Sequence, residues 1–211
     1  MSPVIVLATR NAGKVRELAV LLRPFGVTVK GLDAFQAIGE IEETGTTFTE
    51  NALIKATTVS RLTGLVAVAD DSGLEVDALG GKPGVYSARF SEEPGKPATD
   101  ADNTRKVLAL TVAVPDPQRT IRFRSAMAAA SPTGKTVVAE GAWEGLLARE
   151  PRGANGFGYD PVFIEPELGL TAAEMSPEEK NARSHRARAC AALLKLWPGF
   201  WSEVAASACR Q

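Results

Sequence analysis

The sequence has very few of the residues that hold a fold together through covalent or metal links. It contains two cysteines and one histidine among 211 residues. Cys190 and Cys209 are too few for a disulfide scaffold and lack the spacing of a zinc site. A lone histidine, His185, excludes a histidine-based metal cluster, and no Gly-x-Ser-x-Gly elbow accompanies it for a serine triad. We therefore expect a reducing environment, with Cys190 as a core thiol.

The chain also lacks a strong charge excess and long apolar runs. Its formal net charge is −1, so no overall field attracts it to nucleic acid or to a membrane surface. No apolar stretch approaches the length that crosses a bilayer. The chain passes from Met1-Ser2-Pro3 directly into a strand-like run, which is unlike a signal peptide. These absences predict a cytoplasmic protein that binds neither nucleic acid nor membrane.

What is present is the composition of an ordinary soluble domain, with 45% apolar and 23% charged residues. A chain of this length holds one sizeable core or two small lobes. No linker long enough to separate two domains is visible, so we expect a single domain over residues 1–211. Its core is expected over about residues 4–196, followed by a peripheral Ala/Ser-rich tail.

Apolar periodicity predicts strands that alternate with helices. The predicted strands cover residues 4–8, 27–32, 65–69, 121–129, 135–148 and 162–164, and the predicted helices cover 15–22, 51–62, 100–110 and the stretches after 176 and 184. Residues 121–129 begin with alternating apolar and charged side chains, which indicates a half-exposed antiparallel strand. Its hairpin partner follows a turn at 131–134. This pair is interpreted either as the arm of a second lobe or as a dimer surface.

Two adjacent carboxylates, Asp70 and Asp71, follow the apolar run at 65–69. Burying them is costly unless a cation pairs with them. A metal ion or a ligand often takes this part at the carboxyl edge of a sheet. The alternative is an ordinary strand-to-loop exit with two solvated aspartates. The glycine-rich segment 80–84 that follows indicates a loop of special backbone geometry. From this stretch alone both interpretations stay open.

A polar loop, Thr9 to Lys14, joins the first predicted strand to the first predicted helix. Such a loop presents backbone N–H groups and a helix N-terminus to an anion. Lys14 at the helix start is disfavoured by the helix dipole, unless an anion such as phosphate lies between them. The alternative is a solvated lysine, with Asn11 as a turn or cap residue. The loop is not a Walker A motif, which requires Gly-x4-Gly-Lys-Ser/Thr.

A second acidic pair, Glu42 and Glu43, precedes a glycine turn. Thr47 and Glu50 then have the spacing of a capping box, at the start of the predicted helix that carries Lys55. Glutamates in an exposed loop are usually solvated, and this is our interpretation of the pair unless a partner is near.

Aromatic residues alternate with glycines at 153–161, where Phe157 is placed to stack on a planar ligand. The alternative is a glycine-rich loop pinned by two core aromatics. Further on, Ser176 and Pro177 mark a strong helix start, with Lys180 four residues after the serine. Ser184 is a second N-cap candidate, directly before His185 and Arg186.

These separate signals share one chemistry. Carboxylates from Asp70, Asp71 and either Glu42 or Glu43 suit Mg²⁺, with Mn²⁺ as a substitute. Mg²⁺ typically joins a protein carboxylate to substrate phosphates. Three lysines near turns or helix starts are candidates for phosphate contact: Lys14, Lys55 and Lys180.

Five stretches occur in a fixed order: Thr9-Arg10-Asn11-Ala12-Gly13-Lys14, Glu42-Glu43-Thr44-Gly45-x-Thr47-Phe48, Ala69-Asp70-Asp71-Ser72-Gly73-Leu74, Gly156-Phe157-Gly158-Tyr159-Asp160-Pro161 and Ser184-His185-Arg186. With these stretches the chain resembles the inosine/xanthosine triphosphate pyrophosphatases, the Ham1-like nucleotidases that remove non-canonical nucleotides. The resemblance spans nearly the whole chain. One departure is Arg10, which stands where many members carry glycine or serine.

The resemblance implies a mixed α/β fold, with an elongated central sheet flanked by helices and two lobes around a nucleotide cleft. It implies a Mg²⁺-dependent homodimer. Its implied activity is the cleavage of non-canonical purine nucleoside triphosphates (ITP, dITP and XTP) between the α- and β-phosphates. The products would be the nucleoside monophosphate and pyrophosphate.

The resemblance also implies roles for residues at matching positions. The implied substrate-binding residues are Thr9, Arg10, Asn11, Ala12, Gly13, Lys14, Ser72, Phe157, Gly158, Tyr159, Asp160, Lys180, His185 and Arg186. The implied catalytic residues are Asp71 as proton acceptor, Asp70, Lys14 and Lys55, and the implied metal ligands are Glu42 and Asp71. From the residues alone, the division of roles between Asp70 and Asp71 stays open, as does the choice between Glu42 and Glu43.

Two other functions stay open at this point. A Maf-type pyrophosphatase would act on modified pyrimidine nucleotides. A regulator without catalysis would bind a nucleotide and leave it intact, although the acidic pair and the lysines argue against this.

Overall fold

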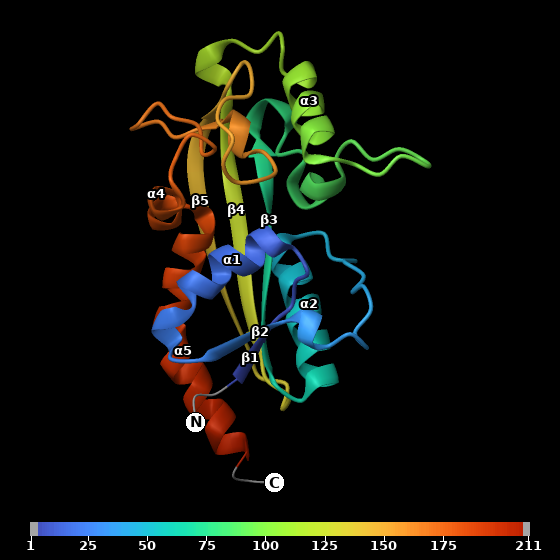
Figure 1. The fold of residues 1–211 in the computed structure, drawn as a ribbon, viewed down its shortest axis with the longest axis vertical. Coiled ribbons are helices and arrows are strands. Elements are labelled where there is room, and N and C mark those ends of the chain that lie inside the picture. The colour runs from blue at the N-terminus through green and yellow to red at the C-terminus, as the bar shows by residue number, and fades with distance from the viewer. Residues whose placement is uncertain (1–3, 209–211) are drawn as a thin grey trace. The chain divides into compact units, whose positions relative to one another are not determined.

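The computed structural model describes residues 4–208, and Cys209 lies outside them. The described chain contains a six-stranded sheet in the order β2-β1-β3-β4-β5-β6 (Figure 1). β1 pairs in parallel with β2 and β3, whereas β5 and β6 pair in antiparallel. The predicted mixed α/β fold is therefore confirmed.

The elements occur close to their predicted places. The strands are β1 (Val4–Leu7), β2 (Thr28–Gly31), β3 (Val66–Val76), β4 (Thr120–Ala130), β5 (Thr136–Leu147) and β6 (Phe163–Ile164). The helices are α1 (Ala12–Leu21), α2 (Phe48–Thr63), α3 (Asp100–Leu110), α4 (Pro177–Arg183) and α5 (His185–Ala208). None of these described helices is both long and apolar enough to cross a membrane.

The chain divides into two compact units, which agree with the two lobes that were expected. The first unit contains residues 4–71, 125–141 and 186–208 of the described chain, and the second contains residues 72–124 and 142–185.

In the first unit, helices cover both faces of the sheet. Side chains alternate along β3, so Val66 and Val68 face α1 and α5, whereas Ala67 and Ala69 face α2. Figure 1 shows α1 and α5 together, with α2 apart from them across the strands. Because apolar side chains fill both faces, any charged group that follows on β3 enters a buried environment.

Both helices that begin near the acidic strand are capped by polar side chains. Asn11 Oδ1 accepts a hydrogen bond from the Lys14 N–H at 3.0 Å and starts α1. Thr47 and Glu50 form the predicted capping box of α2. Lys14 is the third residue of α1, and Lys55 is the eighth residue of α2, about two turns beyond its cap.

The second unit has its own core, built on the other halves of β3, β4 and β5. Phe123 and Phe163 stack with ring centroids 4.6 Å apart, beside the buried Trp143. Ser176 caps α4 in a capping box with Glu179, as predicted. This core supports the glycine-rich segment 153–158.

The segment predicted as a peripheral tail after about residue 196 is helical, because α5 continues through Pro198 to Ala208. Trp197 and Phe200 are buried, with 7% and 6% exposure. Proline inside a helix costs about 3 kcal/mol, and burial of an aromatic side chain contributes about 1.5–3 kcal/mol. Two buried aromatics therefore offset the proline.

The most consequential difference lies in β3. The strand was expected to end at Ala69, but it continues to Val76 and contains both aspartates. Asp70 is 1% exposed and Asp71 is 6% exposed. The interpretation of these residues as solvated groups at a strand exit is therefore wrong, and both need partners inside the protein.

Candidate active site

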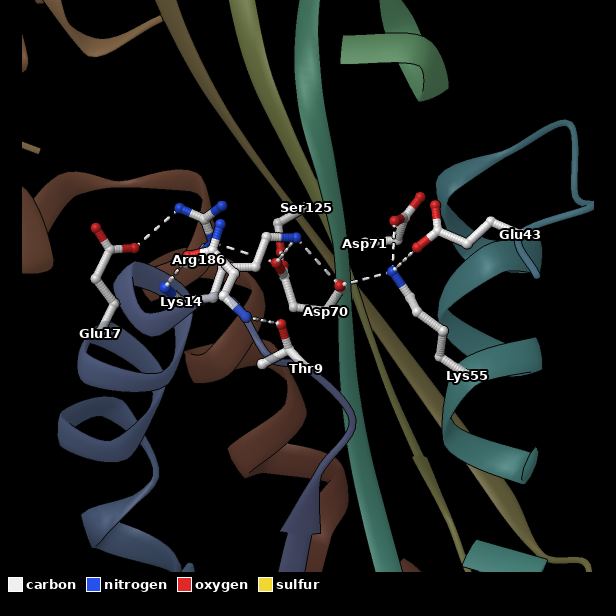
Figure 2. A network of polar contacts seen from close by, with 10 residues as sticks. Thr9, Lys14, Glu17, Glu43, Lys55, Asp70, Asp71, Ser125 and Arg186 are labelled. Atoms are coloured by element: carbon white, nitrogen blue, oxygen red, sulfur yellow. Dashed lines mark hydrogen bonds and ion pairs between the residues drawn. The ribbon is translucent and has the colours of Figure 1, made fainter. Parts of the chain in front are cut away.

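Asp70 and Asp71 point to opposite faces of β3. Alternation along the strand continues the pattern of the apolar residues before them, so Asp70 faces α1 and α5, and Asp71 faces α2. Figure 2 shows the two carboxylates on either side of the strand, each with its own partners. The strand therefore separates two adjacent acids into two different environments.

Asp70 is held by two cations and a hydroxyl. Lys14 Nζ lies 2.8 Å and Arg186 Nε 3.2 Å from Asp70 Oδ2. Ser125 Oγ donates to Oδ1 at 2.6 Å. Arg186 also pairs with Glu17 of α1 at 2.9 Å. Burial favours the protonated acid, but Lys14 and Arg186 outweigh it and hold the pKa of Asp70 well below its usual range. Asp70 is therefore held as a carboxylate that joins α1 and α5 to β3.

Among the described residues, Asp71 forms an ion pair with one cation, Lys55. Lys55 Nζ of α2 donates to Asp71 Oδ1 at 2.6 Å and to Glu43 Oε1 at 2.8 Å. Burial raises the pKa of Asp71, and Lys55 only partly opposes this. Burial by itself would lower the pKa of Lys55, but Asp71 and Glu43 raise it above its ordinary value. On this face two carboxylates converge on one cation.

The two networks meet at the main-chain carbonyl of Asp70. Its oxygen accepts from Lys14 Nζ at 3.3 Å and from Lys55 Nζ at 3.1 Å. The carbonyl is accessible because β1 stops at Leu7, and its last bond to β3 runs from the Ala8 N–H to the Val68 carbonyl at 2.8 Å. The two ammonium groups therefore lie together just beyond the carboxyl end of β1.

The loop after β1 faces the same place. Thr9 Oγ1 accepts from the Asn11 N–H at 3.2 Å. The N–H groups of Ala12 and Gly13 occupy first-turn positions, where a helix offers no internal acceptor. Arg10 instead donates to the Ile38 carbonyl and lies 3.9 Å from Asp33. Arg10, predicted as a substrate contact, is thus directed toward the segment after β2.

The second unit brings Phe157, Asp160 and Lys180 together. Asp160 Oδ2 accepts from the Phe157 N–H at 2.8 Å and from Lys180 Nζ at 2.7 Å. Lys180 Nζ lies 4.9 Å from the centroid of the half-buried Phe157 ring. Gly156 leaves no space for a side chain, because an added Cβ would come within 2.0 Å of Asp160 Oδ2. The loop backbone therefore lies directly against Asp160.

The remaining predicted residues of the second unit have packing partners. Tyr159 is buried and donates its hydroxyl to the Ser87 carbonyl at 2.8 Å. Gly158 donates its N–H to Asp100 Oδ2 at 2.7 Å. His185 is 2% exposed and stacks on Phe123, with centroids 4.8 Å apart. The interpretation of a loop pinned by aromatics therefore holds for Tyr159. Ser72 begins this unit, directly after Asp71.

Two partners in the Asp70 network were absent from the predicted site, the buried Ser125 and the half-buried Glu17. Ser125 is a polar residue in the otherwise apolar second half of β4, and this interruption is a readable signal. Glu17 follows Lys14 at helical spacing on the same face of α1, which is the second signal. Ser125 donates to Asp70 directly, and Glu17 pairs with Arg186, which in turn pairs with Asp70.

The carboxylates of the first unit suit only a magnesium ion that takes most of its ligands from water and phosphate. Among residues 4–208, no three acidic, histidine or cysteine side chains lie close enough to enclose a metal. Asp71 and Glu43 nevertheless already share one cation, the Lys55 ammonium. Mg²⁺ commonly binds one or two carboxylates and takes its other ligands from water and phosphate. The donor set fits this arrangement, and it includes Glu43, whereas Glu42 is exposed.

Comparisons with known proteins identify similar chains. The sequence profile of the Ham1 family matches residues 5–196. A dITP/XTP pyrophosphatase of Nitratidesulfovibrio vulgaris is 62% identical over 93% of this chain and 97% of its own length. One from Streptococcus thermophilus is 46% identical, and the chain spans 60% of its length. A HAM1 protein structure from Coxiella burnetii has 44% identity and a TM-score of 0.83, covering 93% of this chain and 99% of its own.

Proposed function

Because the chain belongs to the Ham1 family, we propose that it is a Mg²⁺-dependent pyrophosphatase of non-canonical purine nucleoside triphosphates. It hydrolyses ITP, dITP and XTP to the nucleoside monophosphate and pyrophosphate, which removes them from the nucleotide pool. The observation that carries the proposal is the meeting of Lys14 and Lys55 at the end of β1, with two carboxylates on Lys55. Ammonium groups in this position bind phosphate oxygens. The carboxylates of Asp71 and Glu43 hold a metal ion, and Asp71 accepts a proton.

The reaction is a displacement at the α-phosphorus. Water attacks the phosphorus, the bond to the oxygen that bridges the α- and β-phosphates breaks, and pyrophosphate leaves. Asp71 accepts the proton of the attacking water. Without a metal ion, burial raises the pKa of Asp71 above its ordinary value. Lys14 and Lys55 stabilise the negative charge on the phosphate oxygens, together with the N–H groups at the start of α1.

Asp71 and Glu43 are the residues that would hold Mg²⁺, in company with phosphate oxygens. When bound, Mg²⁺ supplies electrostatic stabilisation of the transferred phosphoryl group. Asp70 takes no part in this chemistry, because Lys14, Arg186 and Ser125 already engage its carboxylate.

Rejection of adenine rests on the 6-position of the base, whereas guanine shares the 6-oxo group and must be rejected at the 2-position. Hypoxanthine and xanthine present an oxygen acceptor at the 6-position, and adenine presents an amino donor. A backbone N–H or an arginine that meets this edge is left unpaired by adenine, and such a mismatch discriminates strongly. The half-buried Phe157 ring provides a stacking surface.

A product assay with ITP and Mg²⁺ tests the proposal. We expect IMP and pyrophosphate in equal amounts. Production of IDP and orthophosphate, or no turnover at all, would overturn it. A panel of nucleotides at equal concentration also distinguishes the alternatives: a Maf-type enzyme prefers modified pyrimidine nucleotides, and a regulator binds ITP without hydrolysis.

The homodimer and the cytoplasmic location are also part of this proposal, and both rest on the family resemblance. Light scattering of the full chain tests the oligomeric state, since a monomeric mass at micromolar concentration contradicts the dimer. A requirement for Mg²⁺ is tested by chelation with EDTA and by restoration of activity with Mg²⁺ or Mn²⁺.

A further inference from the structure

The loop that carries Glu43 is fastened to α2 by a fully buried amide. Asn51, in the second turn of α2, has 0% exposure. Its Oδ1 accepts a hydrogen bond from the Gly45 N–H at 2.8 Å. Gly45 lies so close to the helix that an added Cβ would come within 2.6 Å of both Asn51 Oδ1 and Glu50 Cβ. The loop backbone therefore rests directly on this amide.

The orientation of the Asn51 amide is fixed by this contact. If the amide were turned over, its NH₂ group would face the Gly45 N–H and two donors would oppose each other. In the orientation observed, Nδ2 is buried and no described residue offers it an acceptor. A buried donor without an acceptor costs about 1–3 kcal/mol. The contact with Gly45 is thus kept at a cost in stability.

Stability alone does not account for an asparagine here. Leucine has a similar volume and would bring no unsatisfied donor of its own to this position. What leucine lacks is the oxygen that holds Gly45. The asparagine therefore serves the position of the loop rather than the packing of the helix.

The same helix face carries Lys55. Asn51 and Lys55 are four residues apart, so their side chains are neighbours on α2. Glu43, two residues before Gly45, pairs with Lys55 at 2.8 Å. The bond from Gly45 to Asn51 therefore sets the distance between the Glu43 carboxylate and the face of α2 that meets Asp71.

We propose that Asn51 is a positioning residue that holds the Glu42–Thr47 loop so that Glu43 and Asp71 converge on one cation. The proposal rests on the proposed function in that this cation is the Mg²⁺ of the reaction. Asn51 itself touches neither the metal nor the substrate. A residue that orients a ligand in this way typically changes metal affinity 10–100-fold when it is removed.

The test compares Asn51→Leu and Gly45→Ala with the wild type. Asn51→Leu removes the acceptor of the Gly45 N–H. Gly45→Ala adds a methyl group on the loop side of the same contact, which pushes the loop away from α2. Ser60→Ala is the matched control, because Ser60 is also buried on α2 but bonds the Leu65 carbonyl at 2.7 Å, at the far end of the helix.

Two measurements are made on each variant. Amide hydrogen exchange of residues 42–47, without nucleotide, reports the loop directly and does not depend on the proposed reaction. The Mg²⁺ concentration for half-maximal ITP hydrolysis reports the cation site. For both loop variants we expect faster exchange of this segment and about a tenfold higher Mg²⁺ requirement, while Ser60→Ala changes neither.

Each outcome decides the matter. If exchange or the Mg²⁺ requirement stays at the wild-type level in folded Asn51→Leu, the proposal is wrong. If Asn51→Leu does not fold, Gly45→Ala alone decides by the same two measurements. Absence of ITP hydrolysis in the wild type contradicts the proposed function and with it the cation role, but unchanged exchange in a protein that hydrolyses ITP contradicts only the role of Asn51.

Discussion

Asp70 and Asp71 are consecutive residues that bind lysines from helices on opposite faces of the sheet. Asp70 pairs with Lys14 of α1 at 2.8 Å, and Asp71 pairs with Lys55 of α2 at 2.6 Å. The pKa of Asp70 is held low and the pKa of Asp71 is raised. One of the two acids therefore serves to bind the elements of the first unit, and the other is suited to accept a proton. The proposed function divides the roles in this way, with Asp71 as the proton acceptor.

Asp71→Asn is expected to abolish turnover while the protein stays folded. The amide keeps the shape of the side chain and can still accept from Lys55, but it cannot take a proton from water. We expect kcat for ITP to fall by a factor of about 10²–10⁴, the usual contribution of a general base. Steady-state kinetics measures this, and thermal unfolding provides the control. Wild-type turnover in the variant would remove Asp71 from the mechanism.

Asp70→Asn is expected to act on stability. It leaves Lys14 and Arg186 buried without their shared carboxylate, and breaking a buried pair in this way costs about 3–5 kcal/mol. Because the folded pKa of Asp70 is depressed, its stabilisation is complete above the ordinary value of 3.8 and is lost as the pH falls toward the folded value. Urea unfolding at neutral and acidic pH should show a difference from the wild type that shrinks in acid. A difference independent of pH contradicts this account.

Lys14 is expected to set the alkaline limit of activity. Burial lowers its pKa below 10.5, although Asp70 opposes the shift. kcat/KM should therefore fall on the alkaline side at a pH below 10.5, as Lys14 loses its charge. Lys14→Arg should move this limb to higher pH, because a guanidinium stays protonated. An unchanged limb in the arginine variant assigns the titration to another group.

Lys14→Ala should lower both affinity and stability. If Lys14 only bound phosphate, its loss would raise KM and leave unfolding unchanged. Its ion pair with the fully buried Asp70 predicts an additional loss of stability. Kinetics and urea unfolding on one preparation separate the two effects, and an unaltered unfolding midpoint argues against the pair.

The buried pair in the second unit is expected to hold the Phe157 loop. The side chains of Lys180 and Asp160 are 6% and 3% exposed and lie 2.7 Å apart. Lys180→Met leaves a buried carboxylate without its cation, which costs about 3–5 kcal/mol. Adding Asp160→Asn removes the charge and keeps an acceptor for the Phe157 N–H, so the double variant should regain most of this loss. Urea unfolding of both variants checks that stability falls from the wild type to the double variant and then to Lys180→Met.

Local signals in the sequence predicted most elements. The capping box of Thr47 and Glu50 and the N-cap at Ser176 were readable because capping depends on residues three apart in the chain. The extent of β3 was not, since its second half contains Asp70, Asp71 and Gly73, which are unfavourable in strands. Only partners from distant segments make those residues acceptable there.

The same limit applies to the site. The motifs named Lys14, Lys55 and both aspartates, but no local pattern tells which lysine meets which aspartate. That pairing follows from alternation along a strand whose length was itself unknown. Ser125 went unnoticed because it is a single polar residue in a buried stretch, and Asn51 because it follows the polar start of α2. The use of each depends on a partner outside its own element.

The alternation that separates Asp70 from Asp71 also restricts how this strand can change in evolution. Loss or gain of one residue between Val66 and Ala69 would turn Asp70 toward α2 and Asp71 toward α1, so each acid would meet the lysine meant for the other. Substitutions in this stretch need only preserve size, whereas a change of one in its length exchanges the two roles. Insertions and deletions are therefore expected to be excluded here, even though the residues between are plain alanine and valine.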